Sequence, residues 1–158
     1  MTVICMPFLG MFTLHDMLAT TFRITRPSAR DVVDQDGKMV GDDWLSVTYV
    51  NDVLEIGRQL CDALHYLHGK DMLHLDLKPA NILMDDAQRP IILDFNLSYD
   101  AGGLPGQAGG TFGYMSPEQR QVVLAGRGYV KDLDARTDVF SVGVILFELF
   151  NGVLPFVN

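Results

Sequence analysis

Apolar residues recur every three or four positions in the middle of the chain. From Asp52 onward this spacing places them at positions 53, 56, 60, 63, 64 and 67. They then share one face of an α-helix that packs on a core. Asp52 and Glu55 resemble a capping pair at its start, and Gly69 suits its end. The pattern therefore predicts one amphipathic helix over residues 52–68.

A second helix is predicted near the other end of the sequence, where the residues DVFSVGVILFELFNG begin at Asp138. Thr137 can cap this helix and Gly152 can end it. Because it is apolar on nearly all sides, we expect a central helix with other elements packed on several sides. Its apolar run over 139–150 is interrupted by polar residues and is too short to span a bilayer.

Shorter apolar runs predict strands. Residues 2–8 look like a core strand, and residues 90–93 look like a buried strand that ends at Asp94. The segment 85–88 holds two aspartates and a glutamine, which supply turn chemistry. A small β-hairpin is therefore expected before Asp94.

The remaining segments are predicted to be connections. Residues 14–19 suit a short helix, and residues 21–49 form a polar, Asp-rich stretch broken by proline and glycine. We expect that stretch to be a surface insertion. Residues 97–110 contain five glycines, which makes a regular element improbable and predicts a mobile loop.

Length and charge limit the classes of function that the chain can have. The 158 residues are 48% apolar, enough for one core, so one domain is expected. Lys plus Arg total 12 and Asp plus Glu total 20, a net charge of −8. This argues against general binding to nucleic acid or to anionic membranes, which need a positive surface. Cys5 and Cys61 lack metal spacing and are expected to be reduced thiols. Without a signal-peptide pattern, a cytoplasmic protein is expected.

Polar residues gather after the first predicted helix, in HLDLKPANILMDDAQRPIILDFN over residues 74–96. Asp76, Asn81 and Asp94 provide two carboxylates and an amide around Lys78. Oxygen ligands of this kind suit Mg²⁺, and a lysine among them suits a transferring phosphate. A single loop aspartate is more often a turn residue, but the joint spacing is typical of phosphoryl-transfer chemistry carried on a hairpin.

Four motifs in this order resemble those of eukaryotic-like (Hanks-type) serine/threonine protein kinases, most closely the bacterial ones. HLDLKPAN at 74–81 resembles their HRDLKxxN catalytic loop, and DFN at 94–96 resembles their DFG. GTFGYMSPEQ at 110–119 is similar to the end of their activation segment. DARTDVFSVGVILFELFNGVLPF at 134–156 is similar to their buried central helix and the following turn.

The resemblance implies a mainly α fold with a small β-hairpin, that is, an α+β kinase C-lobe. Residues 1–10 would be the last N-lobe strand and the hinge, and residues 11–158 an incomplete C-lobe. We therefore expect a truncated catalytic domain without its N-lobe, since no glycine-rich phosphate loop, VAIK-type lysine or partner glutamate precedes Met6. Such a fragment is expected to be inactive alone.

The resemblance also implies roles for single residues. Asp76 would orient the substrate hydroxyl and accept its proton, and Lys78 would stabilise the transferring phosphate. Thr111 would lie beside both and favour serine or threonine as acceptor. Asn81 and Asp94 would hold Mg²⁺ or Mn²⁺ together with ATP.

An adenine site is implied at the start of the chain. Residues 6–9 resemble the segment that links the two kinase lobes and holds adenine through backbone groups. Pro7 has no N–H, so its carbonyl would serve, and the Leu9 N–H would be the donor. Leu83 would form an apolar floor under the ring, although a strand core residue would also be a leucine.

Several positions depart from the family pattern or have two interpretations. Leu75 replaces an arginine that, in many kinases, pairs with an activation-loop phosphate, and no Ser, Thr or Tyr lies between Asp100 and Gly110. Asn96 replaces the DFG glycine but tolerates positive φ. Asp138 either caps its helix or, by resemblance, supports the catalytic-loop backbone. Glu118 would be a buried carboxylate without its arginine partner.

Three functions therefore remain open from the sequence. The first is an ATP-dependent protein kinase that phosphorylates serine or threonine in a protein substrate. The second is a non-catalytic kinase-like (pseudokinase) module that binds partners or remnant nucleotide. The third is a small-molecule phosphotransferase with the shared HxDxxxxN pattern, against which the SPE segment and Thr111 argue.

Overall fold

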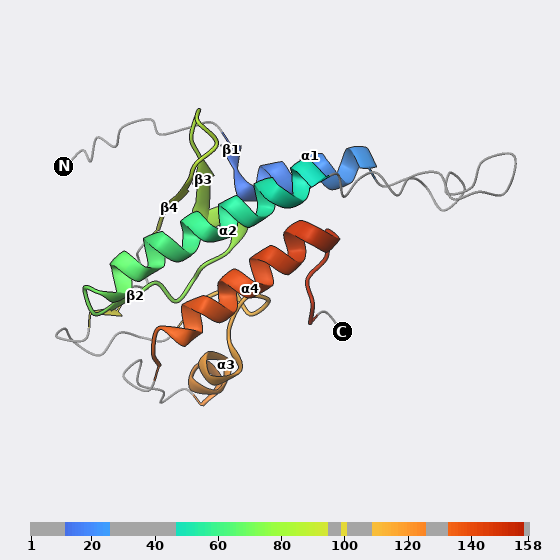
Figure 1. Ribbon diagram of the computed structural model, residues 1–158. Coiled ribbons are helices and arrows are strands. Elements are labelled where there is room, and N and C mark those ends of the chain that lie inside the picture. Colours follow the sequence, from blue (N-terminus) through green and yellow to red (C-terminus); the bar gives the residue numbers. More distant parts are fainter. Residues whose placement is uncertain (1–11, 26–46, 95–98, 101–108, 126–132, 157–158) are drawn as a thin grey trace, which may run out of the picture.

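The computed structural model describes residues 12–25, 47–94, 99–100, 109–125 and 133–156, and Figure 1 shows their arrangement. Its helices are α1 (Leu14–Thr25), α2 (Val47–His68), α3 (Pro117–Leu124) and α4 (Arg136–Asn151), with a 3-10 turn at Pro79–Asn81. Its strands are β1 (Phe12–Thr13), β2 (Met72–Leu73), β3 (Ile82–Met84), β4 (Pro90–Ile92) and β5 (Tyr99–Asp100). The described residues thus form a mainly α fold with small antiparallel sheets.

Helices α2 and α4 lie side by side and form the centre of the core (Figure 1). The apolar stripe predicted on α2 is buried there, with Val53 and Leu60 fully covered and packed in one cluster with Ile145 and Leu149 of α4. Gly57 permits the close approach, because a Cβ at this position would lie 3.0 Å from the Leu146 side chain. Burial of these side chains is the main source of stability for the pair.

The predicted start of α2 is wrong. The helix begins at Val47, so Asp52 and Glu55 lie inside it and form no capping pair. Glu55 instead accepts hydrogen bonds from Arg58 and Gln59 along the exposed surface. The predicted end is confirmed, since the helix stops at His68. The extra N-terminal turn carries Tyr49, whose hydroxyl donates to the Leu149 carbonyl of α4.

Helix α4 begins at Arg136 and not at Asp138, and Thr137 lies in its first turn without capping it. The Asp134 side chain instead accepts the Arg136 N–H at 2.8 Å. The predicted end is confirmed: Gly152 adopts φ +67° and donates to the Glu148 carbonyl. One face of α4 is exposed at Val139 and Phe147. Packing on several sides was expected, and α2, the loop before α3 and the segment after the helix do contact α4 away from that face.

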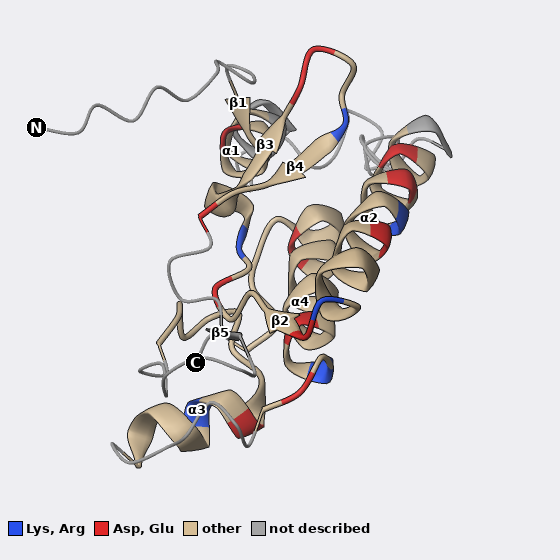
Figure 2. Cartoon of the chain, turned by 90° about the vertical axis from the view of Figure 1, so that its left-hand side faces the viewer, with Lys and Arg blue, Asp and Glu red and all other residues tan. Residues whose placement is uncertain are grey.

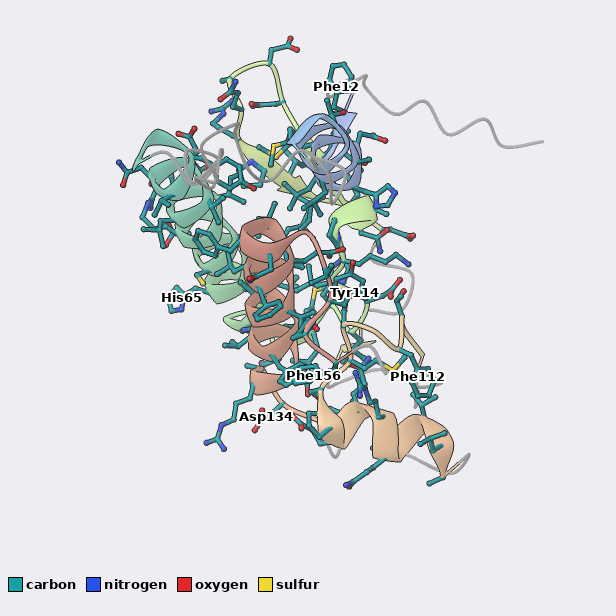
Figure 3. All side chains as sticks on the ribbon, turned by 90° about the vertical axis from the view of Figure 1, so that its right-hand side faces the viewer. Phe12, His65, Phe112, Tyr114, Asp134 and Phe156 are labelled. Atoms are coloured by element: carbon teal, nitrogen blue, oxygen red, sulfur yellow. The ribbon has the colours of Figure 1, made fainter. Side chains whose placement is uncertain are left out.

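The chain turns back after α4. The ring of Phe156, labelled in Figure 3, stacks on Phe140 of α4. The ring centroids are 5.9 Å apart. Tyr114, also labelled in Figure 3, reaches α4 from the loop before α3 and donates to Glu148 at 2.6 Å. Burial and the Glu148 carboxylate both raise the pKa of Tyr114. The neutral phenol therefore ties this loop to the central helix.

The predicted hairpin is confirmed. Strand β3 pairs antiparallel with β4 on one side and with β1 on the other, and Ile82 lies opposite Ile92. Asp85 forms the turn by accepting the Ala87 and Arg89 N–H groups. Strand β4 is only partly buried, because it lies at the sheet edge, where Pro90 is tolerated.

Two other expectations require correction. Helix α1 extends to Thr25, beyond the predicted 14–19 and into the stretch expected to be irregular. Strand β5 pairs with β2 inside the segment 97–110, which was expected to hold no regular element. The predicted strand at 2–8 lies outside the described residues.

Charge is distributed unevenly over this fold. Figure 2 shows acidic residues along α2 and at the tip of the β3–β4 hairpin, in keeping with the net charge of −8. Across the described ranges, none of the helices has the length and hydrophobicity needed to cross a membrane.

Candidate active site

The loop 74–81 leaves β2 and enters β3, and α4 fixes its backbone. Asp138 of α4 is fully buried, and its carboxylate accepts the N–H groups of His74 and Leu75, each at 2.9 Å. The same carboxylate lies 2.8 Å from Nε2 of His68 at the end of α2. Asp138 therefore supports the loop, which decides between the two interpretations of this residue.

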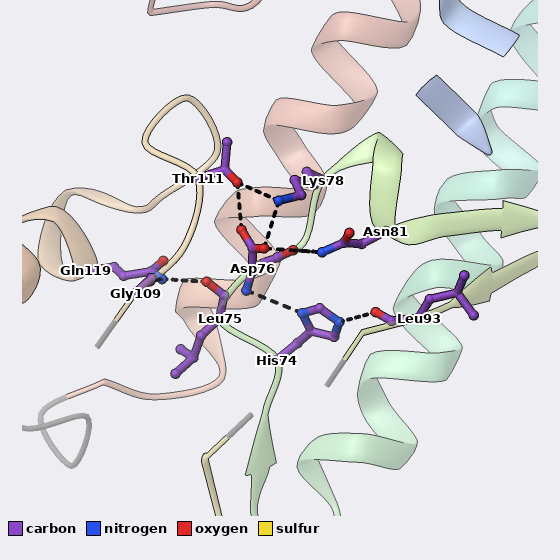
Figure 4. A network of polar contacts seen from close by, with 9 residues as sticks. All are labelled: His74, Leu75, Asp76, Lys78, Asn81, Leu93, Gly109, Thr111 and Gln119. Atoms are coloured by element: carbon purple, nitrogen blue, oxygen red, sulfur yellow. Dashed lines mark hydrogen bonds and ion pairs between the residues drawn. The ribbon is translucent and has the colours of Figure 1, made fainter. Parts of the chain in front are cut away.

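Three residues predicted to act together do meet in the structure (Figure 4). Thr111 donates from Oγ1 to Oδ1 of Asp76 at 2.8 Å, and Nζ of Lys78 lies 2.9 Å from Oδ2. Lys78 also contacts Thr111 at 2.9 Å, which closes a triangle of polar groups. The side chains of Asp76 and Lys78 are 14% and 27% exposed, so both are partly shielded while remaining open to a ligand.

Asn81 fixes the Asp76 carboxylate from the other side. Its Nδ2 donates to the Asp76 carbonyl at 2.9 Å and to Oδ2 at 3.2 Å. Both amide protons are thus directed at Asp76, which leaves the amide oxygen of Asn81 to face elsewhere. The residue is buried at the end of the 3-10 turn, where Pro79 starts the turn with a pre-set φ.

His74 connects the loop to the end of β4. Its Nδ1 accepts the Asp76 N–H at 3.3 Å, so Nε2 carries the proton and donates to the Leu93 carbonyl at 2.9 Å. The Leu93 N–H in turn donates to the Asn81 carbonyl at 2.8 Å. Asp94 follows directly, exposed and with φ +63°. These contacts hold the two predicted metal ligands on adjoining segments.

The donor set fits a hard cation. The amide oxygen of Asn81 and the exposed carboxylate of Asp94 are oxygen ligands, and Mg²⁺ takes few protein ligands besides water and phosphate. Within the described ranges, no group of three or more His, Cys, Asp or Glu residues could hold a metal by itself. The pair thus suits a cation shared with a phosphate ligand better than a metal held by protein alone.

The predicted adenine site is only partly described. Leu83 lies on β3, between Thr13 and Ile91 in register, and it is partly buried. Its neighbour Ile82 belongs to the core, so Leu83 points to the opposite face of the strand. Pro7 and Leu9 lie outside the described residues, as do Phe95 and Asn96 of the DFN motif.

Sequence reasoning missed two features of this site. Nothing in the motifs marks His68, yet only 16% of its side chain is exposed and it contacts Asp138. Glu118 was expected to be buried, and that expectation is wrong: the residue is exposed and accepts a 3.5 Å hydrogen bond from Thr137. The position of His68 four residues after Leu64, at the edge of the predicted core stripe, is the sequence signal that could have identified it.

Comparison of the amino-acid sequence with known protein families identifies the family of this chain. A sequence model of the protein kinase domain matches residues 4–158. The chain therefore belongs to the protein kinase domain family, and the resemblance to Hanks-type serine/threonine kinases is confirmed.

Named relatives come from plants and bacteria. The chain is 44% identical over 104 residues to putative CBL-interacting protein kinase 27 of Oryza sativa subsp. japonica, covering 63% of this chain and 24% of that protein. It is 33% identical over 134 residues to serine/threonine-protein kinase PknB of Mycobacterium leprae (strain TN), covering 82% of this chain and 19% of that protein. The chain thus spans about a quarter or less of the curated relatives it matches.

Proposed function

We propose that these residues belong to the catalytic domain of a serine/threonine protein kinase, which transfers the γ-phosphate of ATP to a protein hydroxyl. The observation that supports this most strongly is the triangle of Asp76, Lys78 and Thr111, whose polar atoms lie 2.8–2.9 Å apart. Serine/threonine specificity is supported by the names of the relatives. In this proposal residues 1–10 form the last N-lobe strand and the hinge, and residues 11–158 form part of the C-lobe.

The proposed chemistry relies on position and charge, because phosphoryl transfer requires little covalent work from the protein. Asp76 accepts a hydrogen bond from the acceptor hydroxyl and takes its proton as the new P–O bond forms. Lys78 neutralises negative charge on the transferring group. Thr111 and Asn81 hold the Asp76 carboxylate in one orientation, so that no reorganisation is needed at the moment of reaction.

Asn81 and Asp94 would hold Mg²⁺ or Mn²⁺. The ion supplies charge stabilisation for the phosphate oxygens of ATP when it is bound. Isothermal titration of Mg-ATP into the protein and into Asp94→Asn measures this role, with Asp86→Asn, an exposed turn residue, as the matched control. Weaker binding by Asp94→Asn alone supports the assignment, and equal affinities for all three proteins contradict it.

For the adenine ring we propose the Pro7 carbonyl, the Leu9 N–H and the Leu83 side chain. The orientation of Leu83 away from the core supports the last of these. We place the protein in the cytoplasm, with a protein substrate and ATP as partners and without nucleic acid.

The test is a phosphotransfer assay with the protein in its full natural length. Rates are measured with Mg-ATP and with serine, threonine and tyrosine peptides and a small-molecule alcohol as acceptors. The proposal predicts transfer to serine or threonine peptides, a loss on Asp76→Ala, and little transfer by the 158-residue chain alone. Binding of ATP without any transfer would favour the pseudokinase alternative. Transfer only to the alcohol would favour the small-molecule phosphotransferase.

A further inference from the structure

We propose that Gln119 is a positioning residue that ties the catalytic loop to the segment carrying Thr111, and that it does so without phosphorylation. Two hydrogen bonds from its side-chain amide, to the carbonyls of Leu75 and Gly109, form what we call the Gln119 bridge. The inference rests on the proposed function, because its purpose is to hold Thr111 beside Asp76 and Lys78.

The geometry of the bridge is unambiguous. Nε2 of Gln119 lies 2.6 Å from the Leu75 carbonyl and 2.8 Å from the Gly109 carbonyl, and the residue is 1% exposed (Figure 4). Both neighbours are acceptors, so both amide protons must face them. Oε1 is buried and finds no hydrogen-bond partner among the described residues. The side chain is thus oriented by its two donors alone.

Leu75 is the residue that most needs this contact. Its φ is +68°, a left-handed conformation that is strained for leucine and persists only where the surroundings hold it. Asp138 binds its N–H at 2.9 Å, and Gln119 binds its carbonyl. With both backbone polar groups bound, the direction in which the chain enters Asp76 is fixed.

Gly110 packs closely against the Gln119 bridge. Its φ is +127°, and a Cβ there would lie 2.6 Å from the Leu75 carbonyl and 3.0 Å from Nε2 of Gln119. Only glycine permits the chain to pass this close to the bridge. The next residue is Thr111, which contacts Asp76 and Lys78. The Gln119 bridge therefore binds the chain one residue before Asp76 and two residues before Thr111.

The Gln119 bridge links the catalytic loop to the segment before Thr111 without a phosphate. Leu75 stands where many kinases carry an arginine that pairs with an activation-segment phosphate, and residues 101–110 contain no Ser, Thr or Tyr. A neutral glutamine amide now joins the same two segments. Because it carries no charge, the bridge forms without a phosphate and is insensitive to salt.

The first test is hydrogen exchange of the backbone amides in residues 109–114, measured by mass spectrometry on the full-length protein. Gln119→Met keeps the shape of the side chain but removes both donors, and Gln121→Met, exposed on the same helix, is the matched control. We expect at least a tenfold loss of protection in Gln119→Met and no change in the control. Unchanged protection in Gln119→Met would overturn the proposal.

A second variant keeps the test valid if Gln119→Met fails to fold. In Gln119→Glu the ionised carboxylate faces two carbonyl oxygens, so the neutral acid is favoured in the folded protein and the pKa of this glutamate is raised. Protection of 109–114, corrected for intrinsic exchange, is then expected to be partly kept at pH 5, where the single O–H of the neutral acid can donate to one of the two carbonyls, and lost by pH 8. All other ionisable groups are common to wild type and variant, so subtracting the wild-type profile isolates the effect of the new carboxyl group. A pH-independent variant contradicts the bridge.

Phosphotransfer separates this proposal from the proposed function. We expect Gln119→Met to lower kcat at least tenfold with an unchanged KM for ATP, because Thr111 and not the nucleotide site is displaced. If protection falls while no form of the protein transfers phosphate, the bridge holds and the proposed function fails. If Asp76→Ala abolishes transfer while Gln119→Met changes neither protection nor kcat, the proposed function holds and the bridge fails.

Discussion

Replacing Asp138 by asparagine tests how the central helix holds the catalytic loop. The carboxylate is fully buried and accepts three contacts, two at Oδ2 from His74 N–H and His68 and one at Oδ1 from Leu75 N–H. Asparagine has the same shape but one acceptor oxygen. Its NH₂ group must therefore face at least one backbone N–H, whichever way the amide is turned.

The expected loss follows from that mismatch. One backbone hydrogen bond to a charged acceptor disappears, worth roughly 1.5–3 kcal/mol, and a buried N–H is left unsatisfied at a similar cost. Removing a buried charge lowers the desolvation penalty and offsets part of this. We expect a net loss of about 2–4 kcal/mol in the free energy of unfolding. For a domain of this size the melting temperature would fall by roughly 5–15 °C.

The measurement is urea unfolding followed by far-UV circular dichroism, with thermal melting as a second probe. Asp62→Asn is the matched control, because Asp62 lies on α2 with 68% of its side chain exposed, and little change is expected there. If Asp138→Asn and Asp62→Asn unfold at the same urea concentration, the contacts of Asp138 do not stabilise the loop and the reasoning is refuted.

Three further predictions concern the core, a loop and a turn. Leu60→Ala should lower the free energy of unfolding by about 2–5 kcal/mol in urea titration, because the Leu60 side chain of α2 is fully buried in the core that α2 forms with α4. Burial and Glu148 raise the pKa of Tyr114, so the neutral phenol stabilises the fold below its unfolded pKa of about 10 and this contribution is lost at higher pH. Raising the pH above about 10 should therefore lower the melting temperature of wild type more than that of Tyr114→Phe. Equal changes in the two melting temperatures would argue against the contact between Tyr114 and Glu148. Hydrogen bonds from Arg89 lower the pKa of Asp85, so the turn should be intact above about pH 4 and lose amide protection below it, a change absent from Asp85→Ala.

The chemistry of the site was predictable because its residue types are restricted. Asp76, Lys78 and Asn81 lie within one short loop, so their proximity follows from local sequence, and the structure places their side chains in contact. Thr111 was placed beside them only through the family resemblance. No physical reading of the sequence brings together residues 35 positions apart.

The errors have physical reasons. The first turn of α2 contains Val47, Thr48 and Val50, which have low helix propensity, so the sequence favoured a later start. Packing of Tyr49 against α4 overrides that preference. Strand β5 has two residues, too few for any periodicity, and exists through its pairing with β2.

Contacts across long stretches of sequence were least predictable. Only the family resemblance offered the supporting role of Asp138, and no pattern offered that of Gln119, because both bind backbone groups of a loop that lies 63 and 44 residues away. An aspartate can also cap a helix and a glutamine can also lie on the surface. The residue type alone therefore does not show that either side chain is buried and holds the loop. In the same way, the strain at Leu75 is invisible in the sequence, since leucine is normally right-handed or extended.

The most direct test of the proposed catalytic centre is the effect of Asp76→Asn on phosphotransfer from Mg-ATP to a serine or threonine peptide by the full-length protein. The substitution keeps the shape of the side chain and a hydrogen-bond acceptor but removes the base. We expect kcat to fall by roughly 10²–10⁴-fold with little change in the KM for ATP. An Asp76→Asn protein that turns over at the wild-type rate would contradict the account.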